Sequence, residues 1–374
     1  MLRSAAGKPH NTAISAVCFG VVFVILLTIA SFAVKPAGGE VYDIVNTTGR
    51  LRNLEAEDED TIDVLFAGNS LVFRDISPMQ IWGLKGITSY DLSDGAMRLC
   101  DQQVLIDAAC KRQHPRLLVL EAGTMFSNAS PYKDDYALPT NLLEKIFPIF
   151  HYHEIYKSFS LFEEPEDPWK PLKGFDPSED VKPYEGDFDY ISNDHDKPSD
   201  IPSLNREYLD EILDHCRKNN ISLLITAMPS PENYDVNTHE ALKAWTGEKG
   251  LPFLDLNTLT DEIGIDWQTD TKDHGDHLNL SGSKKVSAYL ADYLSENYDL
   301  EDHRGEERFA KWDEALQFNA EPRACRGARP NTPGWTARRP LAKPILHGGV
   351  RVAIWRTGGA PNCNDEAYEK AELY

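Results

Sequence analysis

The chain has 374 residues and a formal net charge of −22 at pH 7, with 60 acidic against 38 basic side chains. This excess of carboxylates would repel nucleic-acid phosphates, so we expect no nucleic-acid partner. The chain has no Cys-x-x-Cys pair among its six cysteines, and their spacing predicts neither a zinc site nor a disulfide framework.

An uncharged stretch lies near the amino terminus. Residues 11–34 contain no charged side chain, and Arg3 and Lys8 precede them. At about 1.5 Å per residue, a helix of this length crosses a hydrocarbon core of about 30 Å. It is longer than the roughly 7–15 apolar residues of a cleavable signal peptide, which is the alternative. We expect residues 1–35 to form a cytoplasmic stub and a single-pass anchor, with the rest of the chain outside the cell membrane.

The next segment predicts a linker and then a domain. The charge run from Glu55 to Asp60 indicates a solvated acidic linker over residues 36–60. Ile62 to Ala67 is an apolar run of the length of a buried parallel strand. It ends in Gly68-Asn69-Ser70, which would deliver a hydroxyl at the carboxyl end of the strand, where open α/β sheets bind their ligands.

Strand-like and helix-like patterns then alternate as far as residue 300. This alternation predicts an α/β domain over residues 61–300 with a five-stranded parallel sheet between helix layers. A Pro- and Asp-rich interval at about 130–202 interrupts it and predicts an insertion, either beside the substrate or as a surface excursion. The later strand-like segments are 87–92, 116–121, 221–227 and 252–256, and the helix-like segments are 99–113, 204–219, 238–249 and 283–298.

A second chemically distinctive segment runs from Asp273 to Gly282, just before the last helix-like segment. A serine hydroxyl needs an imidazole to accept its proton and a carboxylate to orient that imidazole, and this segment contains both. The alternative is a solvated acidic loop. His274 and His277 with nearby aspartates suggest a metal site, but the Gly-containing turn lacks the fixed helical spacing of such ligands, so we expect no metal.

Together, the two segments resemble the SGNH or GDSL hydrolase superfamily. Gly68-Asn69-Ser70 matches its nucleophile block, with Asn where many members have Asp, and His277-Leu278-Asn279 matches its late histidine block. The resemblance covers about residues 61–298 and implies a three-layer flavodoxin-like fold, Ser70 as nucleophile, His277 as base and no cofactor. Gly95 lies where the family has an oxyanion-hole glycine, so the resemblance implies the Ser70 and Gly95 amides as donors.

The chain departs from the family pattern at two places. The third block lacks its asparagine, so Thr124 is a possible further oxyanion donor, and Asn69 and Glu121 are candidate substrate-binding residues. The family's acid lies three residues before the histidine, where this chain has a histidine. Asp273 is the preferred acid, although it requires one extra residue in the turn, and Asp276 is the alternate.

The carboxyl-terminal part, residues 301–374, predicts a poorly ordered extension, because from Glu321 it is basic and rich in Gly and Pro. Two alternatives would explain the basic segment: it contacts an anionic wall polymer, or it reflects an altered reading frame. By analogy with teichoic acid D-alanyl transfer proteins and polysaccharide O-acetyltransferases, we expect a membrane-anchored esterase or O-acyltransferase acting outside the cytoplasm on an acylated envelope polymer or glycan. The competing hypothesis is a catalytically silent protein that holds a glycan in the same cleft.

Overall fold

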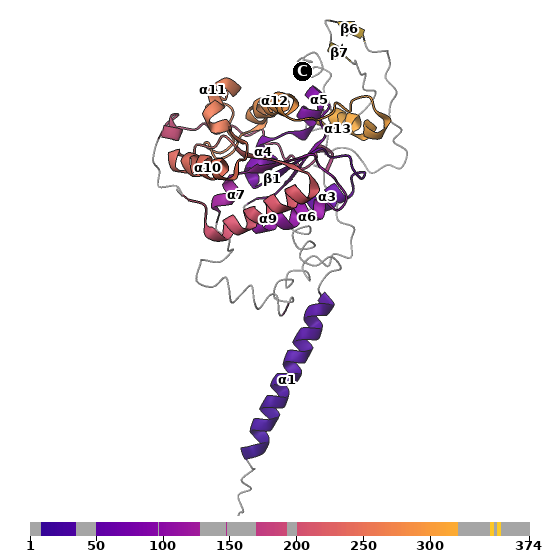
Figure 1. The fold of residues 1–374 in the computed structure, drawn as a ribbon, viewed down its shortest axis with the longest axis vertical. Helices are drawn as coiled ribbons and strands as arrows, with labels where there is room; N and C mark the ends of the chain where they lie inside the picture. The colour runs from indigo at the N-terminus through magenta and orange to yellow at the C-terminus, as the bar shows by residue number, and fades with distance from the viewer. Residues whose placement is uncertain are drawn as a thin grey trace, which may run out of the picture.

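The computed structural model describes residues 9–34, 50–95, 97–127, 147, 170–192, 200–320, 345–347 and 350–352. These residues form an amino-terminal helix and an α/β domain, shown in Figure 1. A separate antiparallel pair, β6 (Ile345–His347) with β7 (Val350–Val352), lies near the end of the chain.

A five-stranded parallel sheet in the order β2-β1-β3-β4-β5 forms the centre of the domain. Nearly all of its residues are buried, as expected for a parallel sheet covered by helices on both faces. The α/β prediction is confirmed, and each strand overlaps a predicted segment. The strands are β1 (Val64–Gly68), β2 (Ser89–Ser93), β3 (Leu117–Glu121), β4 (Ser222–Ala227) and β5 (Phe253–Asp255).

Helices form a layer on each face of the sheet. Helices α5, α12 and α13 pack together on one side, and α3, α6 and α9 pack on the other, as Figure 1 shows. The helices of the domain are α3 (Arg50–Glu55), α4 (Ser70–Asp75), α5 (Pro78–Lys85), α6 (Leu99–Ala109), α7 (Gly123–Phe126), α9 (Ser203–Asn219), α10 (Val236–Lys249), α11 (Thr260–Ile263), α12 (Leu280–Asn297) and α13 (Ala310–Ala320). Short 3-10 helices are η3 (Lys170–Leu172), η4 (Tyr190–Ser192), η5 (Leu256–Leu259) and η6 (Glu307–Phe309).

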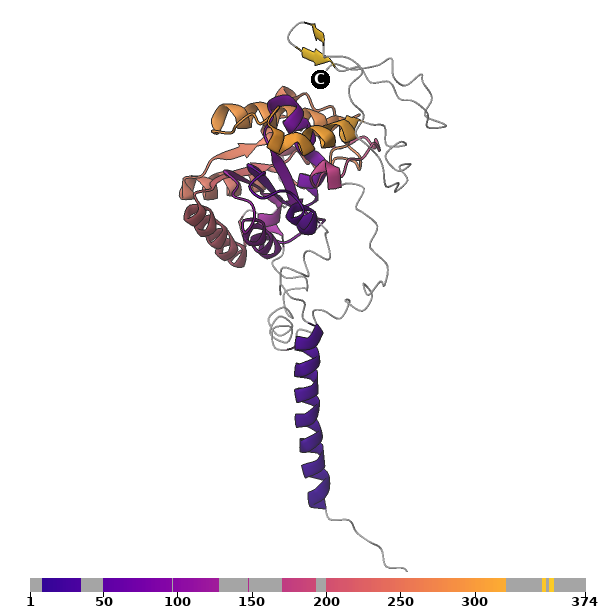
Figure 2. The ribbon, with the colours of Figure 1, turned by 90° about the vertical axis from the view of Figure 1, so that its right-hand side faces the viewer.

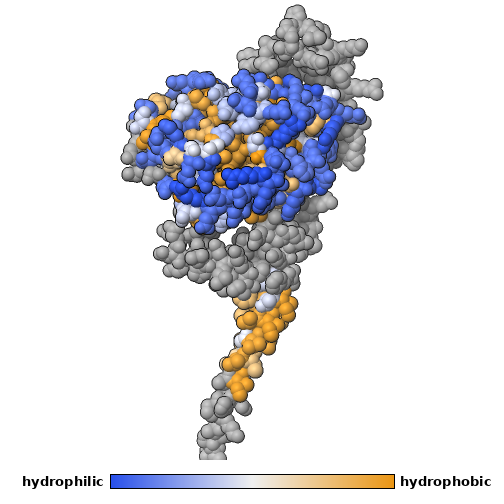
Figure 3. Space-filling view, viewed as in Figure 1, coloured by the Kyte–Doolittle hydropathy of each residue, from blue (hydrophilic) through white to orange (hydrophobic). Residues whose placement is uncertain are grey.

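The amino-terminal helix α1 (Pro9–Val34) is apolar over its length. Figure 2 shows it as one straight helix, and Figure 3 shows its hydrophobic side chains exposed, in contrast to the largely hydrophilic surface of the domain. Among the described residues it is the one helix long and apolar enough to cross a membrane, over Ile14–Ser31. A signal sequence near an amino terminus has the same properties, so the helix fits either a membrane span or a signal sequence.

The domain begins earlier than the sequence predicts. Leu51 and Leu54 of α3 are buried in the core, and the hydroxyl of Tyr90 donates a hydrogen bond to the Arg50 carbonyl at 2.9 Å. The predicted linker boundary at residue 60 is therefore wrong. Leu51 and Leu54 lie three positions apart on the same buried face of α3. The charged residues around them made this apolar face hard to recognise in the sequence.

The domain also ends later than predicted. Trp312 of α13 is 2% exposed, its ring lies 5.4 Å from that of Trp82 in α5, and the Lys173 ammonium lies 4.5 Å from its centroid. Residues 301–320 therefore pack on the domain, and the prediction of a poorly ordered extension is wrong for them. Residues 321–344, 348–349 and 353–374 lie outside the described part of the chain.

The predicted insertion is described only in part. Residues 170–192 pack on the domain through Leu172 and Phe175, which are buried in the core. The Leu280 N–H donates to the Ser178 carbonyl at 2.7 Å, and Lys182 N–H donates to the Thr271 carbonyl at 3.0 Å. This segment therefore lies along the loop that contains His277. Apart from Phe147, residues 128–169 are outside the described part, as are 193–199.

Candidate active site

Ser70 is the first residue of α4, directly after the turn that follows β1. Asn69 is the N-cap of this helix, and its side-chain oxygen accepts a hydrogen bond from the Leu71 N–H at 2.9 Å. Gly68 is required by crowding, because a Cβ there would lie 2.5 Å from Val72 Cγ2 and 2.6 Å from Glu121 Cβ. The glycine thus lets α4 and β3 approach closely, and the asparagine caps the helix that presents the serine.

His277 lies in a loop that is stabilised by hydrogen bonds among its own residues. Its carbonyl accepts hydrogen bonds from the Lys272 N–H at 3.1 Å and the Thr271 hydroxyl at 3.0 Å. His274 and Gly275 both have left-handed backbones, with φ of 65° and 95°. These two left-handed residues accommodate the one extra residue between Asp273 and His277. The resulting turn brings the aspartate back beside the imidazole.

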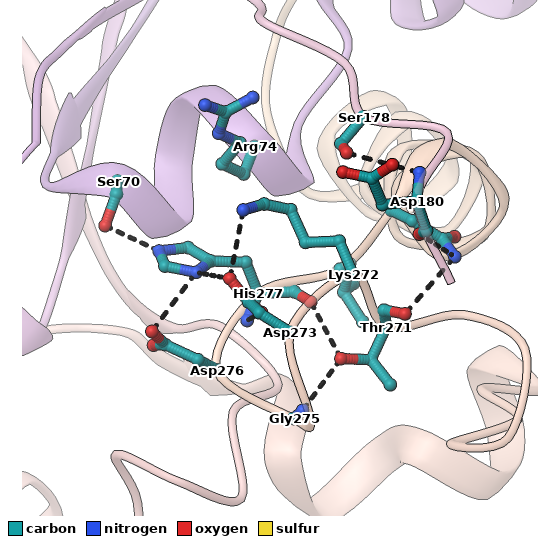
Figure 4. Close-up of polar contacts among 12 residues, drawn as sticks. Ser70, Arg74, Ser178, Asp180, Thr271, Lys272, Asp273, Gly275, Asp276 and His277 are labelled. Carbon is teal, nitrogen blue, oxygen red and sulfur yellow. Dashed lines mark hydrogen bonds and ion pairs between the residues drawn. The ribbon is translucent and has the colours of Figure 1, made fainter. Parts of the chain in front are cut away.

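Serine, histidine and aspartate form a continuous chain of hydrogen bonds, drawn in Figure 4. Ser70 Oγ lies 2.7 Å from His277 Nε2, and His277 Nδ1 lies 2.9 Å from Asp273 Oδ2. The His277 backbone N–H also donates to Asp273 Oδ1 at 2.7 Å, so both carboxylate oxygens hold this histidine. With its proton on Nδ1, the imidazole donates to Asp273 and can accept the serine proton at Nε2, as general-base activation requires.

The two candidate acids differ in their geometry. Burial alone would raise the pKa of Asp273, but hydrogen bonds from the His277 side chain and backbone and from Lys272 outweigh it and hold this pKa well below its ordinary value. Asp276 Oδ2 is farther from Nδ1, at 3.4 Å, and its Oδ1 accepts a hydrogen bond from Asn233 Nδ2 at 2.6 Å. The geometry therefore favours Asp273 over Asp276.

The candidate oxyanion donors have different partners. As the first N–H of α4, that of Ser70 has no intrahelical acceptor. The Gly95 N–H donates to Asp94 Oδ1 at 2.7 Å, so this carboxylate would have to turn away before Gly95 could bind an oxyanion. Thr124 is buried and its hydroxyl donates to the Glu121 carbonyl at 3.0 Å, which makes that hydroxyl unsuitable as a donor.

The candidate substrate-binding residues, Asn69 and Glu121, converge beneath the nucleophile turn. A Cβ on Gly123 would lie 3.0 Å from both Asn69 Nδ2 and Glu121 Oε2. Glu121 is only 2% exposed, and its Oε1 accepts a hydrogen bond from the Gly123 N–H at 2.7 Å, whereas Oε2 has no partner in the described part of the chain. Burial raises the pKa of Glu121 to about 7. A side chain so enclosed is poorly placed to contact substrate.

The acidic groups around His277 do not require a metal. Ligand atoms of Asp273, Asp276 and His277 lie within 4.8 Å of one another, but the same atoms form the contacts described above. His274 Nδ1 lies 3.0 Å from the Pro183 carbonyl instead, and Asp270 pairs with Lys285 at 2.6 Å.

Sequence reasoning missed three side chains that hold this site. Lys272 donates to Asp273, Asn233 donates to Asp276, and Asp75 accepts from the backbone next to His277. Asp75 is an acid at the end of a largely apolar helix, but no local pattern marks its contact to Leu278, which is 203 positions away. Asn233 is distant in the sequence and no pattern marks it.

No family model matches the chain, and no curated protein matches it. Similar solved structures include a GDSL-like lipase from Bacteroides thetaiotaomicron, with 10% identity, a TM-score of 0.36, and coverage of 68% of this chain and 98% of that chain. A lipase/acylhydrolase from Enterococcus faecalis has 11% identity, a TM-score of 0.33, and coverage of 64% and 99%. A family 3 carbohydrate esterase from Clostridium thermocellum has 11% identity, a TM-score of 0.34, and coverage of 63% and 96%. At these scores the similarity supports no argument about activity, which rests on the side chains.

Proposed function

We propose that the protein is a serine esterase or O-acyltransferase of the SGNH type. The observation that supports this most is the hydrogen-bonded chain from Ser70 through His277 to Asp273, with distances of 2.7 and 2.9 Å. It couples a nucleophile, a base and an orienting acid, and it stands at the carboxyl edge of a parallel sheet.

In the proposed reaction, Ser70 Oγ forms a bond to an ester carbonyl carbon while His277 Nε2 takes the hydroxyl proton. Asp273 stabilises the imidazolium, and the Ser70 and Gly95 amides bind the oxyanion once Asp94 has turned away. The bond between the carbonyl carbon and the alcohol oxygen then breaks, and His277 returns the proton to that oxygen. Water or a second hydroxyl next attacks the acyl-serine, and the same proton transfers give a free acid or a new ester.

We further propose that the substrate is an acylated glycan or other cell-envelope polymer, reached from a membrane anchor. Helix α1 supports the anchor, because its residues 14–31 form a span of suitable length and composition. The resemblance of the nucleophile and histidine blocks to envelope members of the SGNH superfamily supports the polymer by analogy.

The test is covalent labelling of the full-length chain in detergent with a fluorophosphonate, followed by peptide mapping. We expect an adduct on Ser70 and release of acetate from an acetyl ester. Ser70→Ala, His277→Ala and the double variant should lose both activities to a similar extent, because nucleophile and base act as a unit. A folded wild-type chain without an adduct, with a reagent proven on another serine hydrolase, would contradict the enzyme proposal.

A glycan-binding protein without catalysis is the second candidate. The observation that favours it is the Gly95 N–H, which is already bonded to Asp94 in a chain that also lacks the third-block asparagine. Such a protein would form no adduct and would bind its glycan equally well after Ser70→Ala and His277→Ala. An enzyme would instead lose its labelling in the same two variants.

A further inference from the structure

Asp75 lies at the opposite end of the helix that begins with Ser70. Its side chain is 0% exposed, and its Oδ1 accepts a hydrogen bond from the Leu278 N–H at 3.0 Å. Leu278 directly follows His277, and the two bonded residues are 203 positions apart in the chain. One short helix thus contains the nucleophile at its first residue and, at its last, a contact to the backbone beside the base.

This contact provides a hydrogen-bond acceptor for the Leu278 N–H, which the histidine loop itself does not provide. The loop's own residues bond the His277 backbone through Thr271, Lys272 and Asp273. The N–H of Leu278, a fully buried residue, is instead satisfied by α4. Loss of the acceptor would leave a buried donor unpaired, which is unfavourable unless the backbone moves.

We propose that Asp75 is a positioning residue that fixes the histidine loop against the nucleophile helix and so sets the approach of His277 Nε2 to Ser70 Oγ. The inference rests on the proposed serine chemistry. Asp75 touches no reacting atom and acts through the backbone of Leu278.

The surroundings of Asp75 favour the neutral form of its carboxyl. Burial raises the pKa of Asp75, the hydrogen bond from Leu278 lowers it, and the negative groups of Glu121, Asp273 and Asp276 raise it further, so that it stays well above the ordinary value. The nearby cations are directed to other acids, since Arg74 pairs with Asp176 and Lys272 with Asp273. The Leu278 hydrogen bond uses only Oδ1 of Asp75, and an asparagine side chain offers one oxygen acceptor of similar shape.

Other contacts keep α4 in place when Asp75 is changed. Arg74 donates to the Asp176 carbonyl at 2.8 Å, and the Asp176 N–H donates to the Phe73 carbonyl at 2.8 Å. Removing the Asp75 acceptor is therefore expected to shift the histidine loop locally rather than unfold the domain. Small displacements of a base from its nucleophile cost up to about 10²-fold in rate.

The experiment compares Asp75→Ala, Asp75→Asn and a control, Asp91→Ala, in the full-length chain. Asp91 of β2 is an equally buried acid, but its carboxyl oxygens accept no hydrogen bond from the described residues. We expect Asp75→Ala to slow fluorophosphonate labelling of Ser70 by about 10–100-fold and to lower kcat with little change in KM. Asp75→Asn should stay within about threefold of wild type, and Asp91→Ala should label at the wild-type rate.

Hydrogen–deuterium exchange at the Leu278 amide tests the contact without relying on activity. We expect this amide to lose protection in Asp75→Ala and to keep it in Asp75→Asn. Wild-type-like labelling of a folded Asp75→Ala variant would overturn the inference. A tenfold loss of labelling in Asp75→Asn would also overturn it, and this second test remains possible if the alanine variant does not fold. If wild type itself forms no adduct, the proposed function fails, and protection of Leu278 still reports whether the contact exists.

Discussion

At the scale of single residues, Asp273 Oδ2 accepts from two donors, His277 Nδ1 at 2.9 Å and Lys272 Nζ at 3.0 Å. Both donors favour the ionised carboxylate, which keeps the pKa of Asp273 below its usual range despite partial burial. The stabilisation from these contacts is therefore present above the pKa of Asp273 in the unfolded chain. It is lost as the pH falls through the lower pKa of the folded state. Asp273 therefore remains an acceptor for His277 throughout the neutral range.

Replacing Asp273 by asparagine should reduce turnover of an acetyl ester by about 10³–10⁴, because an amide no longer holds the required tautomer. Steady-state kinetics measure the change, and thermal unfolding shows whether the fold survives. Asp276→Asn is the matched control and should be nearly silent, since Asp276 is 3.4 Å from Nδ1. The reverse ranking would assign the triad acid to Asp276.

Replacing Glu121 by glutamine should change the pH dependence of stability. The pKa of Glu121 rises from 4.5 to about 7 on folding, mainly through burial. A raised folded pKa means that stability declines as pH increases from about 4.5 to 7. Relative to wild type, Glu121→Gln should gain up to about 3 kcal/mol between pH 4 and pH 8.

Denaturant unfolding at several pH values measures the difference between Glu121→Gln and wild type. Glu248→Gln, on the exposed surface of α10, is the control and should show no such trend. A constant difference between Glu121→Gln and wild type across this pH range would show that folding does not shift the pKa of Glu121.

At the scale of elements, α13 closes one face of the domain. Trp312→Ala should lower the free energy of unfolding by about 3–5 kcal/mol, because it removes a ring packed against Trp82 and Lys173. Denaturant titration measures this loss. Phe188→Ala, at a side chain 57% exposed, should change stability far less. An effect of Trp312→Ala as small as that expected for Phe188→Ala would mean that Trp312 contributes little to the stability of the core.

The sheet was predictable from the sequence because its strands are short apolar runs with helical patterns between them. The nucleophile segment was visible because it follows such a run, and the histidine segment because it combines aspartates and histidines just before a helix-like segment. The predicted domain boundaries were wrong where a few buried side chains lie among charged ones, as Leu51, Leu54 and Trp312 do. The contacts of Asn233 and Asp75 join distant parts of the chain, so no local pattern could predict them.

At the scale of the whole molecule, topology is the property most open to test. In cells carrying the full-length chain, external protease should digest the α/β domain while a tag at the amino terminus stays protected. The physical reason is the apolar helix with positive residues before it and an acidic domain after it. Immunoblotting of both parts measures the result. Recovery of the domain in the cytosolic fraction would contradict the anchored topology.

The distance along the chain between Ser70 and His277, 207 residues, affects when the chain can become reactive. The serine follows the first strand, whereas the histidine follows the fifth, so the two can meet only after the chain beyond all five strands has been made. A chain exported during synthesis, starting with the residues after α1, would present the serine before its base has been made. Under the proposed function, the nascent protein is thus inert toward esters during export, and completion of folding is the event that switches it on.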